Sequence, residues 1–322
     1  MSMLLITSHM PMNDERWKVL RDALPEVEMV YCKDAPPTPE EFARADFILG
    51  IPDPASLVHC KNLKLLQCRS AGADKYTPKG VLPKGAVLAT SNGAFGQSVA
   101  ETMTGVLLLM MKHLDVYSRN MPGHIWEDAG PARTIVDSRV LIIGMGDIGT
   151  EFANRMKSLG AYVIGIRRTG LDKPESVDEL YHQDKIDEIL PSVDTVALFV
   201  PGTAETKHIM SRERLALMKD NAYIINAGRG TAIDQEALCD ALESGKFAGA
   251  GLDVTVPEPL PAENRLWNAP RLFITPHVAG TDHLTVTADK IIKNAAHNIA
   301  AFISGGKLNN EIDCELGYRI LR

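Results

Sequence analysis

Short β-type runs alternate with helix-like stretches along the whole chain, and this alternation restricts its fold more than any other feature. In the first part, amphipathic or polar stretches such as residues 14–23 and 39–45 separate the runs. The runs, rich in apolar and β-branched residues, are residues 3–7, 27–31, 47–50, 63–68 and 87–90. Alternation of this kind predicts parallel strands that are joined by crossover helices.

A second series of such runs follows in the remainder of the chain. Its members are residues 139–143, 162–166, 195–200, 223–226, 251–254 and 272–275. Several are apolar throughout, as strands buried on both faces of a sheet should be. A chain of 322 residues is also too long for one ordinary core. The sequence therefore predicts an α/β protein with two doubly wound parallel-sheet domains.

Two helix-like stretches connect and complete these domains. Residues 97–111 form an apolar helix pattern that we interpret as a contact between domains or subunits, with a helix buried inside one chain as the alternative. Residues 282–303 form a last helix pattern after the second series is complete. We expect a first domain over residues 1–96, a second over 97–282, and a segment 283–322 whose helix returns to the first.

Composition excludes several classes of partner. Hydrophobic residues make up 45% and charged residues 23%, and the net charge of −7 gives no attraction for nucleic acid or anionic lipid. The first thirty residues do not resemble a signal peptide, and the longest apolar stretch, residues 106–111, is too short to span a bilayer. We expect a cytoplasmic protein without a membrane partner. Its five cysteines have no metal-site spacing and are interpreted as small buried residues.

The strongest local motif is the glycine turn Gly144-Met-Gly146-Asp-Ile-Gly149, which follows a β-rich run. Apolar residues at helical spacing come after it and end at Gly160, a plausible helix end. In such a turn the first glycine reverses the chain, the second admits a pyrophosphate, and the third lets helix pack on strand. The helix N-terminus then offers N–H groups to the anion. We therefore predict a dinucleotide site; a turn without a ligand is the alternative.

The next strand end indicates which dinucleotide binds. NAD sites usually carry an acidic residue there, which accepts hydrogen bonds from the ribose 2′-hydroxyl. This chain instead has Arg167, Arg168 and Thr169. Guanidinium groups bind phosphate with paired hydrogen bonds, whereas a carboxylate would repel it. We predict NADP, with NAD as the less favoured cofactor; arginines that merely solvate a strand end are the alternative.

Three candidate reacting groups follow strands in the second half. Arg229, Glu258 and His277 come after the runs at 223–226, 251–254 and 272–275, and open α/β sheets bind ligands at such strand ends. Reduction of a carbonyl needs a cation for the substrate and a general acid for the developing alkoxide. The arginine fork suits a carboxylate, and a glutamate beside the imidazole favours its protonated form.

These motifs, taken together and in order, resemble the D-isomer-specific 2-hydroxyacid dehydrogenases over nearly the whole chain. The matching segments are residues 69–74, 99–101, 144–149, 194–206, 226–230, 251–253, 258–259 and 276–280. The resemblance implies a Rossmann dinucleotide-binding domain and a discontinuous flavodoxin-like substrate domain. It also implies a homodimer built around the helix at residues 99–111.

The resemblance also assigns roles to individual residues. It implies that Arg229 binds substrate, that His277 is the acid/base and that Glu258 is its partner. Backbone N–H groups around Ser70, Ala71 and Gly72 would hold the substrate carboxylate, together with Arg229 and His277. Asp253 would bond the nicotinamide carboxamide, and Arg229 and His277 would also face the cofactor. The remaining cofactor contacts would be Asp147, Ile148, Val200, Pro201, Thr206, Ala227, Gly228 and Gly280.

The sequence thus predicts an NADP-preferring enzyme that reduces a small 2-keto acid to its D-2-hydroxy acid. The substrate side chain would meet loops at residues 50–52 and 70–73 and a helix end near His283, and these suggest a small, uncharged group. One alternative is a catalytically idle, dinucleotide-sensing binding protein of the same fold. Another is formate dehydrogenase chemistry, in which branch the position of Glu258 looks like glutamine.

Overall fold

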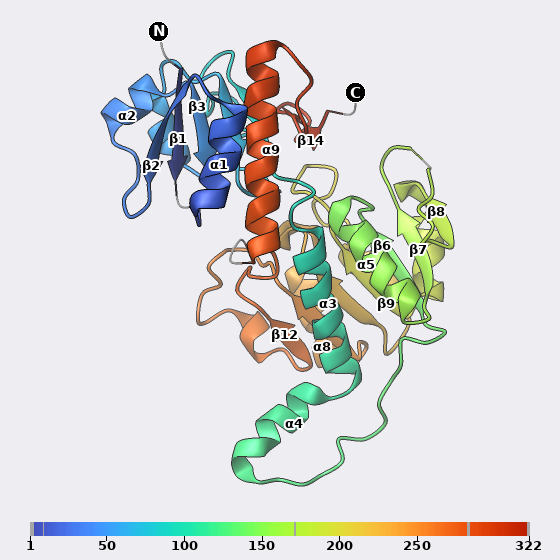
Figure 1. Cartoon of the computed structure of the whole chain (residues 1–322). Coiled ribbons are helices and arrows are strands. Elements are labelled where there is room, and N and C mark those ends of the chain that lie inside the picture. The colour runs from blue at the N-terminus through green and yellow to red at the C-terminus, as the bar shows by residue number, and fades with distance from the viewer. Residues whose placement is uncertain (1–2, 9, 171, 282–283, 321–322) are drawn as a thin grey trace. The chain divides into compact units, whose positions relative to one another are not determined.

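The computed structural model describes residues 3–8, 10–170, 172–281 and 284–320. The chain divides into two compact units (Figure 1). Unit 1 comprises Met1–Phe95 with Thr281–Arg322, and unit 2 comprises Gly96–Gly280. The expected domain boundary at residues 282 and 283 lies outside the described residues, as does His283.

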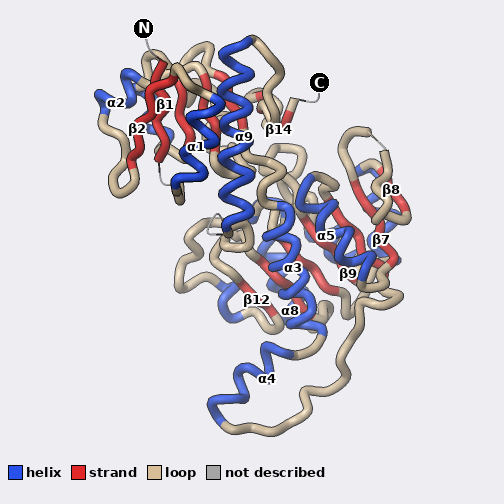
Figure 2. Tube along the Cα trace, in the orientation of Figure 1, coloured by secondary structure: helices blue, strands red, loops and turns tan. Residues whose placement is uncertain are grey.

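Unit 1 is built on a five-stranded parallel sheet in the order β2-β1-β3-β4-β5. Its inner strands are short and mainly apolar because helices and loops cover both faces, as Figure 2 shows for the helices, whereas the edge strand at residues 27–32 is mostly half-buried. The strands are β1 (Met3–Ser8), β2 (Val27–Cys32), β3 (Phe47–Gly50), β4 (Leu65–Cys68) and β5 (Val87–Ala89). This order is that of a flavodoxin-like fold, as predicted.

The C-terminal helix α9 (Thr285–Ser304) completes unit 1, so this unit is discontinuous in sequence. It packs beside α1 (Asp14–Ala23), as Figure 1 shows. Arg16 and Asp289 form an ion pair between the two helices at 2.7 Å. Farther along, the buried Asn298 amide donates to Gln67 on β4 at 2.7 Å. The other elements of unit 1 are α2 (Pro39–Arg44), the 3-10 helix η1 (Pro54–His59), and the hairpin β13 (Ile312–Asp313) and β14 (Tyr318–Arg319).

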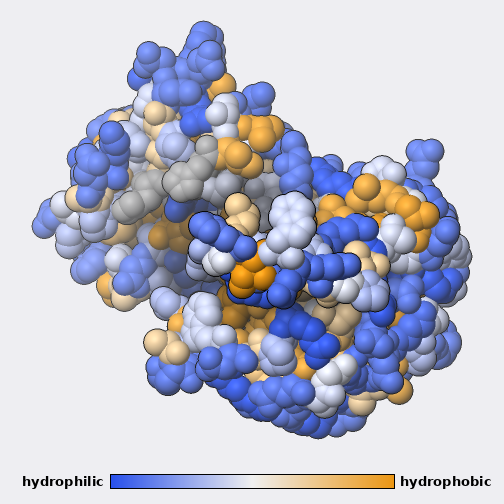
Figure 3. Space-filling view, turned by 90° about the horizontal axis from the view of Figure 1, so that it is seen from below, coloured by the Kyte–Doolittle hydropathy of each residue, from blue (hydrophilic) through white to orange (hydrophobic). Residues whose placement is uncertain are grey.

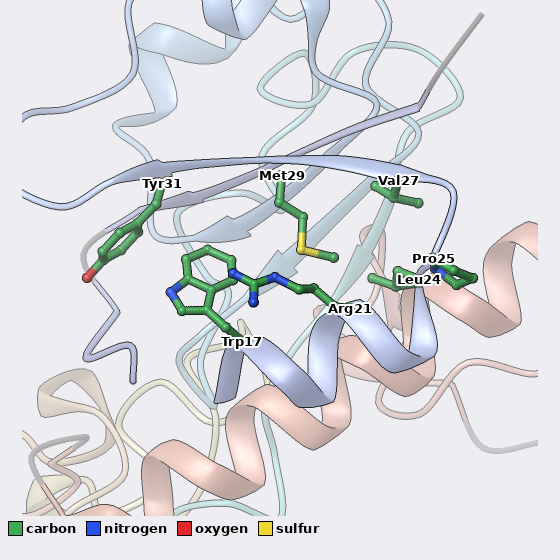
Figure 4. A pocket seen from close by; sticks show the side chains of 7 residues that line it. All are labelled: Trp17, Arg21, Leu24, Pro25, Val27, Met29 and Tyr31. Carbon is green, nitrogen blue, oxygen red and sulfur yellow. The ribbon is translucent and has the colours of Figure 1, made fainter. Parts of the chain in front are cut away.

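A surface hollow of unit 1 lies between α1 and the edge strand β2 (Figure 4). The Arg21 guanidinium lies 5.7 Å from the centroid of the Trp17 ring, and that ring meets Tyr31 edge-on at 5.5 Å. Its lining residues are Trp17, Arg21, Leu24, Pro25, Val27, Met29 and Tyr31. They are different residues from those predicted for the functional site.

Unit 2 contains a seven-stranded sheet in the order β12-β11-β10-β9-β6-β7-β8, with parallel pairing throughout. Sequence order reverses direction between β6 and β9, which is the point where Rossmann sheets bind ligands. The strands are β6 (Arg139–Ile143), β7 (Tyr162–Ile166), β8 (Glu179–Tyr181), β9 (Thr195–Leu198), β10 (Tyr223–Asn226), β11 (Gly249–Leu252) and β12 (Leu272–Ile274). The predicted Rossmann domain is confirmed.

Helices cover both faces of this sheet. The long helices α3 (Gly96–Met111) and α5 (Asp147–Ser158) pack on each other and on the strands. A Cβ at Gly251 of β11 would lie 2.5 Å from Val106, so glycine there lets α3 approach closely. α3 is thus largely buried within its own chain. The other face packs on α6 (Ile186–Ile189), α7 (Arg212–Leu217) and α8 (Gln235–Glu243).

An arm of unit 2 extends beyond this core: α4 (Leu114–Asn120) and the loop to residue 135 (Figure 1). Trp126 is 100% exposed and Met121 74% exposed, and Leu114 and Ile125 are also exposed. Figure 3, a view from below, shows apolar residues interrupting the polar surface. Apolar side chains gathered on one exposed segment indicate a contact surface rather than a core element.

Several expected boundaries were wrong by a few residues. The strand expected at residues 251–254 is β11, Gly249–Leu252, and the helix expected from residue 282 begins in the described chain at Thr285. The strand expected at 195–200 ends at Leu198, because the chain then turns toward Gly144 and Gly228. β8 and α4 were missed, since both are short and largely polar.

The cysteines are all free. Cys60, Cys68 and Cys239 are buried, as interpreted from the sequence, whereas Cys32 and Cys314 are half-buried. Burial raises the pKa of the Cys60 thiol to about 11, which keeps it from forming the reactive thiolate. Among the described helices, none is long and apolar enough to cross a bilayer.

Candidate active site

The glycine turn lies between β6 and α5, and each of its three positions is occupied by glycine for a different physical reason. Gly144 has φ +105°, and a Cβ there would lie 2.7 Å from the carbonyl oxygen of Phe199. A Cβ on Gly149 would lie 2.1 Å from the carbonyl oxygen of Gly144. A Cβ on Gly146, by contrast, would have open space within 4 Å of the described chain. This second glycine therefore leaves room for a ligand, as a pyrophosphate-binding turn requires.

The start of α5 can bind an anion. Gly146 is its N-cap, and in the described chain no side chain caps the first turn. The N–H groups there are available to a ligand. The Asp147 carboxylate instead accepts a hydrogen bond from the Gly96 N–H at 2.8 Å, and Ile148 follows in the same turn. The residues of this turn thus fit a dinucleotide.

The loops after β9 and β10 lie against the glycine turn. A Cβ on Gly228 would lie 2.6 Å from the carbonyl oxygen of Val200, which follows the residue that Gly144 contacts. The Thr206 hydroxyl donates to the Pro201 carbonyl at 2.5 Å and shapes the β9 loop. Half-buried Ala227 precedes Gly228. The predicted cofactor residues of these loops are therefore close together.

The end of β7 differs from expectation in one respect. The Arg167 guanidinium donates to the Met145 carbonyl at 2.9 Å and to the Asp172 carbonyl at 3.2 Å. Arg167 therefore supports the glycine turn itself, while Arg168 and Thr169 are exposed. The sequence pattern predicts the same role for both arginines. The structure shows that Arg167 bonds the glycine turn whereas Arg168 is exposed.

His277 and Glu258 form a hydrogen-bonded pair, with 2.8 Å between imidazole Nδ1 and carboxylate Oε2. The other oxygen, Oε1, accepts the Thr255 N–H at 3.0 Å, which holds the carboxylate in place. The side chains remain 49% and 37% exposed, respectively, so a ligand can reach them. Since Nδ1 is engaged, Nε2 is the nitrogen that can exchange a proton with a ligand.

Arg229 comes from the neighbouring loop, after β10. Its Nη1 donates to the Gly228 carbonyl at 2.7 Å, and its own carbonyl accepts from the buried Asn226 amide at 2.9 Å. A Cβ on Gly230 would lie 2.2 Å from the Thr255 backbone, so the Arg229 and Glu258 loops are tightly packed. Asn226, which we did not predict as a site residue, holds Arg229 from the end of its strand.

Asp253 organises the loop that carries His277. Its buried carboxylate accepts from the Thr275 hydroxyl at 2.6 Å and from the N–H groups of Val278 and Ala279 at 2.9 and 3.1 Å. Its carbonyl accepts the His277 N–H at 2.9 Å. His277 has φ +54°, a conformation that side chains rarely adopt and that these bonds maintain. Gly280 ends this segment.

The predicted carboxylate-binding loop belongs to unit 1. The Ser70 hydroxyl donates to the Gly72 carbonyl at 2.6 Å, and the Ser70 carbonyl accepts the Ser91 N–H at 2.9 Å. Ser70, Ala71 and Gly72 are all half-buried. This loop follows β4, at the carboxyl end of its sheet, where α/β proteins bind ligands.

Residues 104–279 match a family model described as "D-isomer specific 2-hydroxyacid dehydrogenase, NAD binding domain". The match covers more than half of the chain. This protein belongs to that family. It is a dehydrogenase that acts on a CH–OH group with a nicotinamide dinucleotide, and the reaction class is keto-acid reduction.

Relatives of this dehydrogenase have similar length and fold. Glyoxylate/hydroxypyruvate reductase B of Pectobacterium carotovorum is 31% identical over 272 residues, covering 82% of this chain and 84% of the relative. A family member from Aeromonas salmonicida has a TM-score of 0.86 at 28% identity, with coverage of 98% and 100%. The NADPH-dependent glyoxylate/hydroxypyruvate reductase of Sinorhizobium meliloti, solved with NADP and sulfate, has a TM-score of 0.82 at 27% identity, with coverage of 98% and 99%.

Proposed function

We propose that this dehydrogenase reduces a small 2-keto acid to the D-2-hydroxy acid and prefers NADPH. The observation that carries the proposal is the 2.8 Å pair of His277 and Glu258, in loops adjoining that of Arg229. When bound, the dinucleotide would supply a hydride to the carbonyl carbon. The chain must then bind the carboxylate, polarise the carbonyl and deliver one proton.

His277 delivers that proton from Nε2 to the developing alkoxide. Glu258 holds Nδ1 and stabilises the positive charge on the ring until the proton has moved. Arg229 binds the substrate carboxylate and polarises the carbonyl, because its planar fork places several donors on neighbouring oxygens. Backbone N–H groups of Ser70, Ala71 and Gly72 bind the same carboxylate. Asp253 keeps the His277 loop in place and would hydrogen-bond the nicotinamide carboxamide.

The substrate side chain is small and uncharged in this proposal. The loop after β3 supplies Ile51 and the buried Pro52, whose carbonyl accepts the Tyr76 hydroxyl at 2.7 Å. That bond joins it to the loop after β4, which carries Ser70. Apolar groups on linked loops favour a short side chain over a phosphate or a second carboxylate.

A substrate panel tests this activity. NADPH oxidation should be followed at 340 nm with glyoxylate, hydroxypyruvate and pyruvate, with oxaloacetate as the dicarboxylic comparison. We expect turnover with the small keto acids at kcat/KM at least about tenfold above that for oxaloacetate, a difference of about 1.4 kcal/mol. If none of these keto acids supported the oxidation of NADPH or NADH, the proposed reaction would be contradicted.

The preference for NADPH rests on the end of β7. Exposed Arg168 and Thr169 can meet a 2′-phosphate, while Arg167 supports the turn beneath them. The Sinorhizobium meliloti enzyme, a relative of similar fold, is NADPH-dependent by its name. Paired hydrogen bonds from arginine to phosphate explain the preference physically.

Replacing Arg168 with aspartate is expected to lower kcat/KM with NADPH about 10–100-fold and to leave NADH nearly unaffected, because one charge-assisted phosphate contact becomes repulsion. Arg167→Asp is the comparison. Arg167→Asp should also shift selectivity toward NADH. It should, however, lower kcat/KM with both NADPH and NADH, because the bond to the Met145 carbonyl is lost. Steady-state kinetics with both cofactors measure this. A wild-type enzyme that used NADH equally well or better would overturn the preference.

We propose further that the protein is a homodimer in which a second copy covers the arm. The exposed Trp126 and Met121 lie outside the core of unit 2, and Leu108 and Leu109 on α3 are only half-buried. Aromatic and methionine side chains are enriched at the centres of such interfaces. The arm follows α3 in the chain. Its apolar side chains therefore extend the apolar surface of the helix that we predicted to contact a second subunit.

Replacing Trp126 with aspartate should weaken the dimer at least about tenfold, because a charge would replace a large apolar contact. Analytical ultracentrifugation over a concentration series measures the dissociation constant. The matched control is Val58→Asp, at an apolar residue of unit 1 that is 78% exposed outside the arm. A wild-type protein that sediments as a monomer would contradict the proposed dimer. A Trp126 variant that dimerises like wild type would contradict the proposal that the arm forms the interface.

A further inference from the structure

A hollow on the surface of unit 1 has room for a small molecule. It lies between α1 and the edge strand β2 and has a volume of about 570 Å³. Ligand sites in proteins usually measure about 300–1,000 Å³. Figure 4 shows Met29 and Tyr31 extending from β2 toward Trp17 and Arg21 of α1. Because its lining residues all fall within positions 17–31, the hollow is complete within unit 1.

The walls of this hollow are mostly apolar. Val27, Met29 and Tyr31 alternate along β2, so their side chains lie on one face of the strand. Trp17 and Arg21 are four positions apart on α1 and therefore lie on the same side of the helix. β2 is the edge of its sheet, and Met29 and Tyr31 are only half-buried. An apolar ligand can therefore cover side chains that this unit leaves partly in water.

Arg21 is the cation among the described residues that line the hollow, and its guanidinium can bond an anion. In the described chain, no carboxylate forms an ion pair with it. The neighbouring carboxylates bond other cations: Asp22 of α1 pairs with Lys18, and Glu28 of β2 pairs with Arg44. A guanidinium prefers an anionic oxygen acceptor, and a carboxylate matches its planar fork. The lining therefore favours an acid over a neutral or cationic ligand.

The guanidinium of Arg21 is held beside the hollow. Arg21 lies in the last turn of α1, where cations often bond the final carbonyl groups of a helix. Its guanidinium instead lies 5.7 Å from the centroid of the Trp17 ring, one turn earlier. That ring also meets Tyr31 of β2 edge-on at 5.5 Å. A cation that already rests on an aromatic ring loses little freedom when an anion binds, which favours binding.

We propose that this hollow binds a small organic acid with an apolar body. The carboxylate bonds the Arg21 guanidinium, and the aryl or alkyl body packs against Met29 and the apolar residues beside it. Inorganic anions lack the body and neutral analogues lack the charge, so each should bind more weakly. The site does not depend on the proposed function, because residues 17–31 include none of those proposed to bind substrate or cofactor.

The test uses 4-phenylbutyrate and its uncharged amide, 4-phenylbutanamide, as probes of the wild-type enzyme. Binding is followed by the chemical shift of the Trp17 indole N–H, which the Trp17→Phe variant assigns. We expect 4-phenylbutyrate to bind with a Kd of about 1 mM or lower and the amide at least about tenfold more weakly, equivalent to about 1.4 kcal/mol. Equal affinity for the acid and the amide, or no shift of the Trp17 signal at about 10 mM acid, would overturn the proposal.

Arg21→Gln should lower the affinity for 4-phenylbutyrate at least about tenfold and leave that for the amide nearly unchanged. The matched control is Arg44→Gln, which removes another exposed guanidinium of unit 1 and should bind the acid like wild type. Equal losses in the two variants would refute a specific role for Arg21.

Arg229→Ala separates the hollow from the proposed active site, where a carboxylate also binds. The Trp17 shift should persist in that variant, whichever keto acid the enzyme reduces. If the shift were lost in Arg229→Ala but kept in Arg21→Gln, the acid would bind at Arg229, and the proposed site would be wrong.

Discussion

Replacing His277 with alanine is expected to lower kcat for keto-acid reduction about 10²–10⁴-fold, while the NADPH dissociation constant stays within about threefold. The reason is the geometry of the pair: Glu258 holds Nδ1 at 2.8 Å, which leaves Nε2 as the donor to the alkoxide. Stopped-flow and steady-state rates at saturating substrate give kcat, and fluorescence titration gives cofactor binding.

Glu258→Gln is the comparison for that variant. The amide can still hold the imidazole but carries no charge to stabilise its protonated form, so we expect a smaller loss, about 10–100-fold in kcat. An H277A enzyme that turned over at a near-normal rate would show that another group donates the proton.

Replacing Arg229 with alanine should lower kcat/KM about 10³-fold or more, with KM raised and kcat reduced. Both change because one guanidinium binds the carboxylate in the ground state and polarises the carbonyl in the transition state. The matched control is Arg265→Ala, another arginine of unit 2, whose guanidinium bonds Glu236, Asp240 and Glu243 at the surface. Normal kinetics in the Arg229 variant would remove the arginine from the proposed mechanism.

Much of the fold could be predicted because burial leaves a direct pattern in the sequence. Strand β6 is apolar from Val140 to Ile143 because helices cover both sides of it, and the glycine turn after it identifies the Rossmann unit. Edge strand β8 was missed because Glu179 and Tyr181 are half-exposed, so the strand carries neither a continuous nor an alternating apolar pattern.

Part of the candidate site could be predicted from the sequence for a similar reason. Arg229, Glu258 and His277 follow neighbouring strands, and neighbouring parallel strands end at one edge of the sheet. Contacts between distant residues leave no such periodic signal. The bond between Gly96 and Asp147 spans 51 positions, and the bond from Arg167 to the Met145 carbonyl involves a backbone atom that any residue would supply. The catalytic and cofactor roles of individual residues stay predictions until the variants are measured.

The backbone of His277 has a consequence for how this enzyme can diversify. Asp253 anchors the imidazole-bearing peptide directly from the end of β11, so the exposed residues Ala262 and Glu263, between Glu258 and β12, do not set its position. Insertions and deletions there should be tolerated during evolution, whereas a single-residue change in length between Thr275 and Ala279 would break the anchor. A change of length at this point of the surface should therefore leave the proposed proton donor in place.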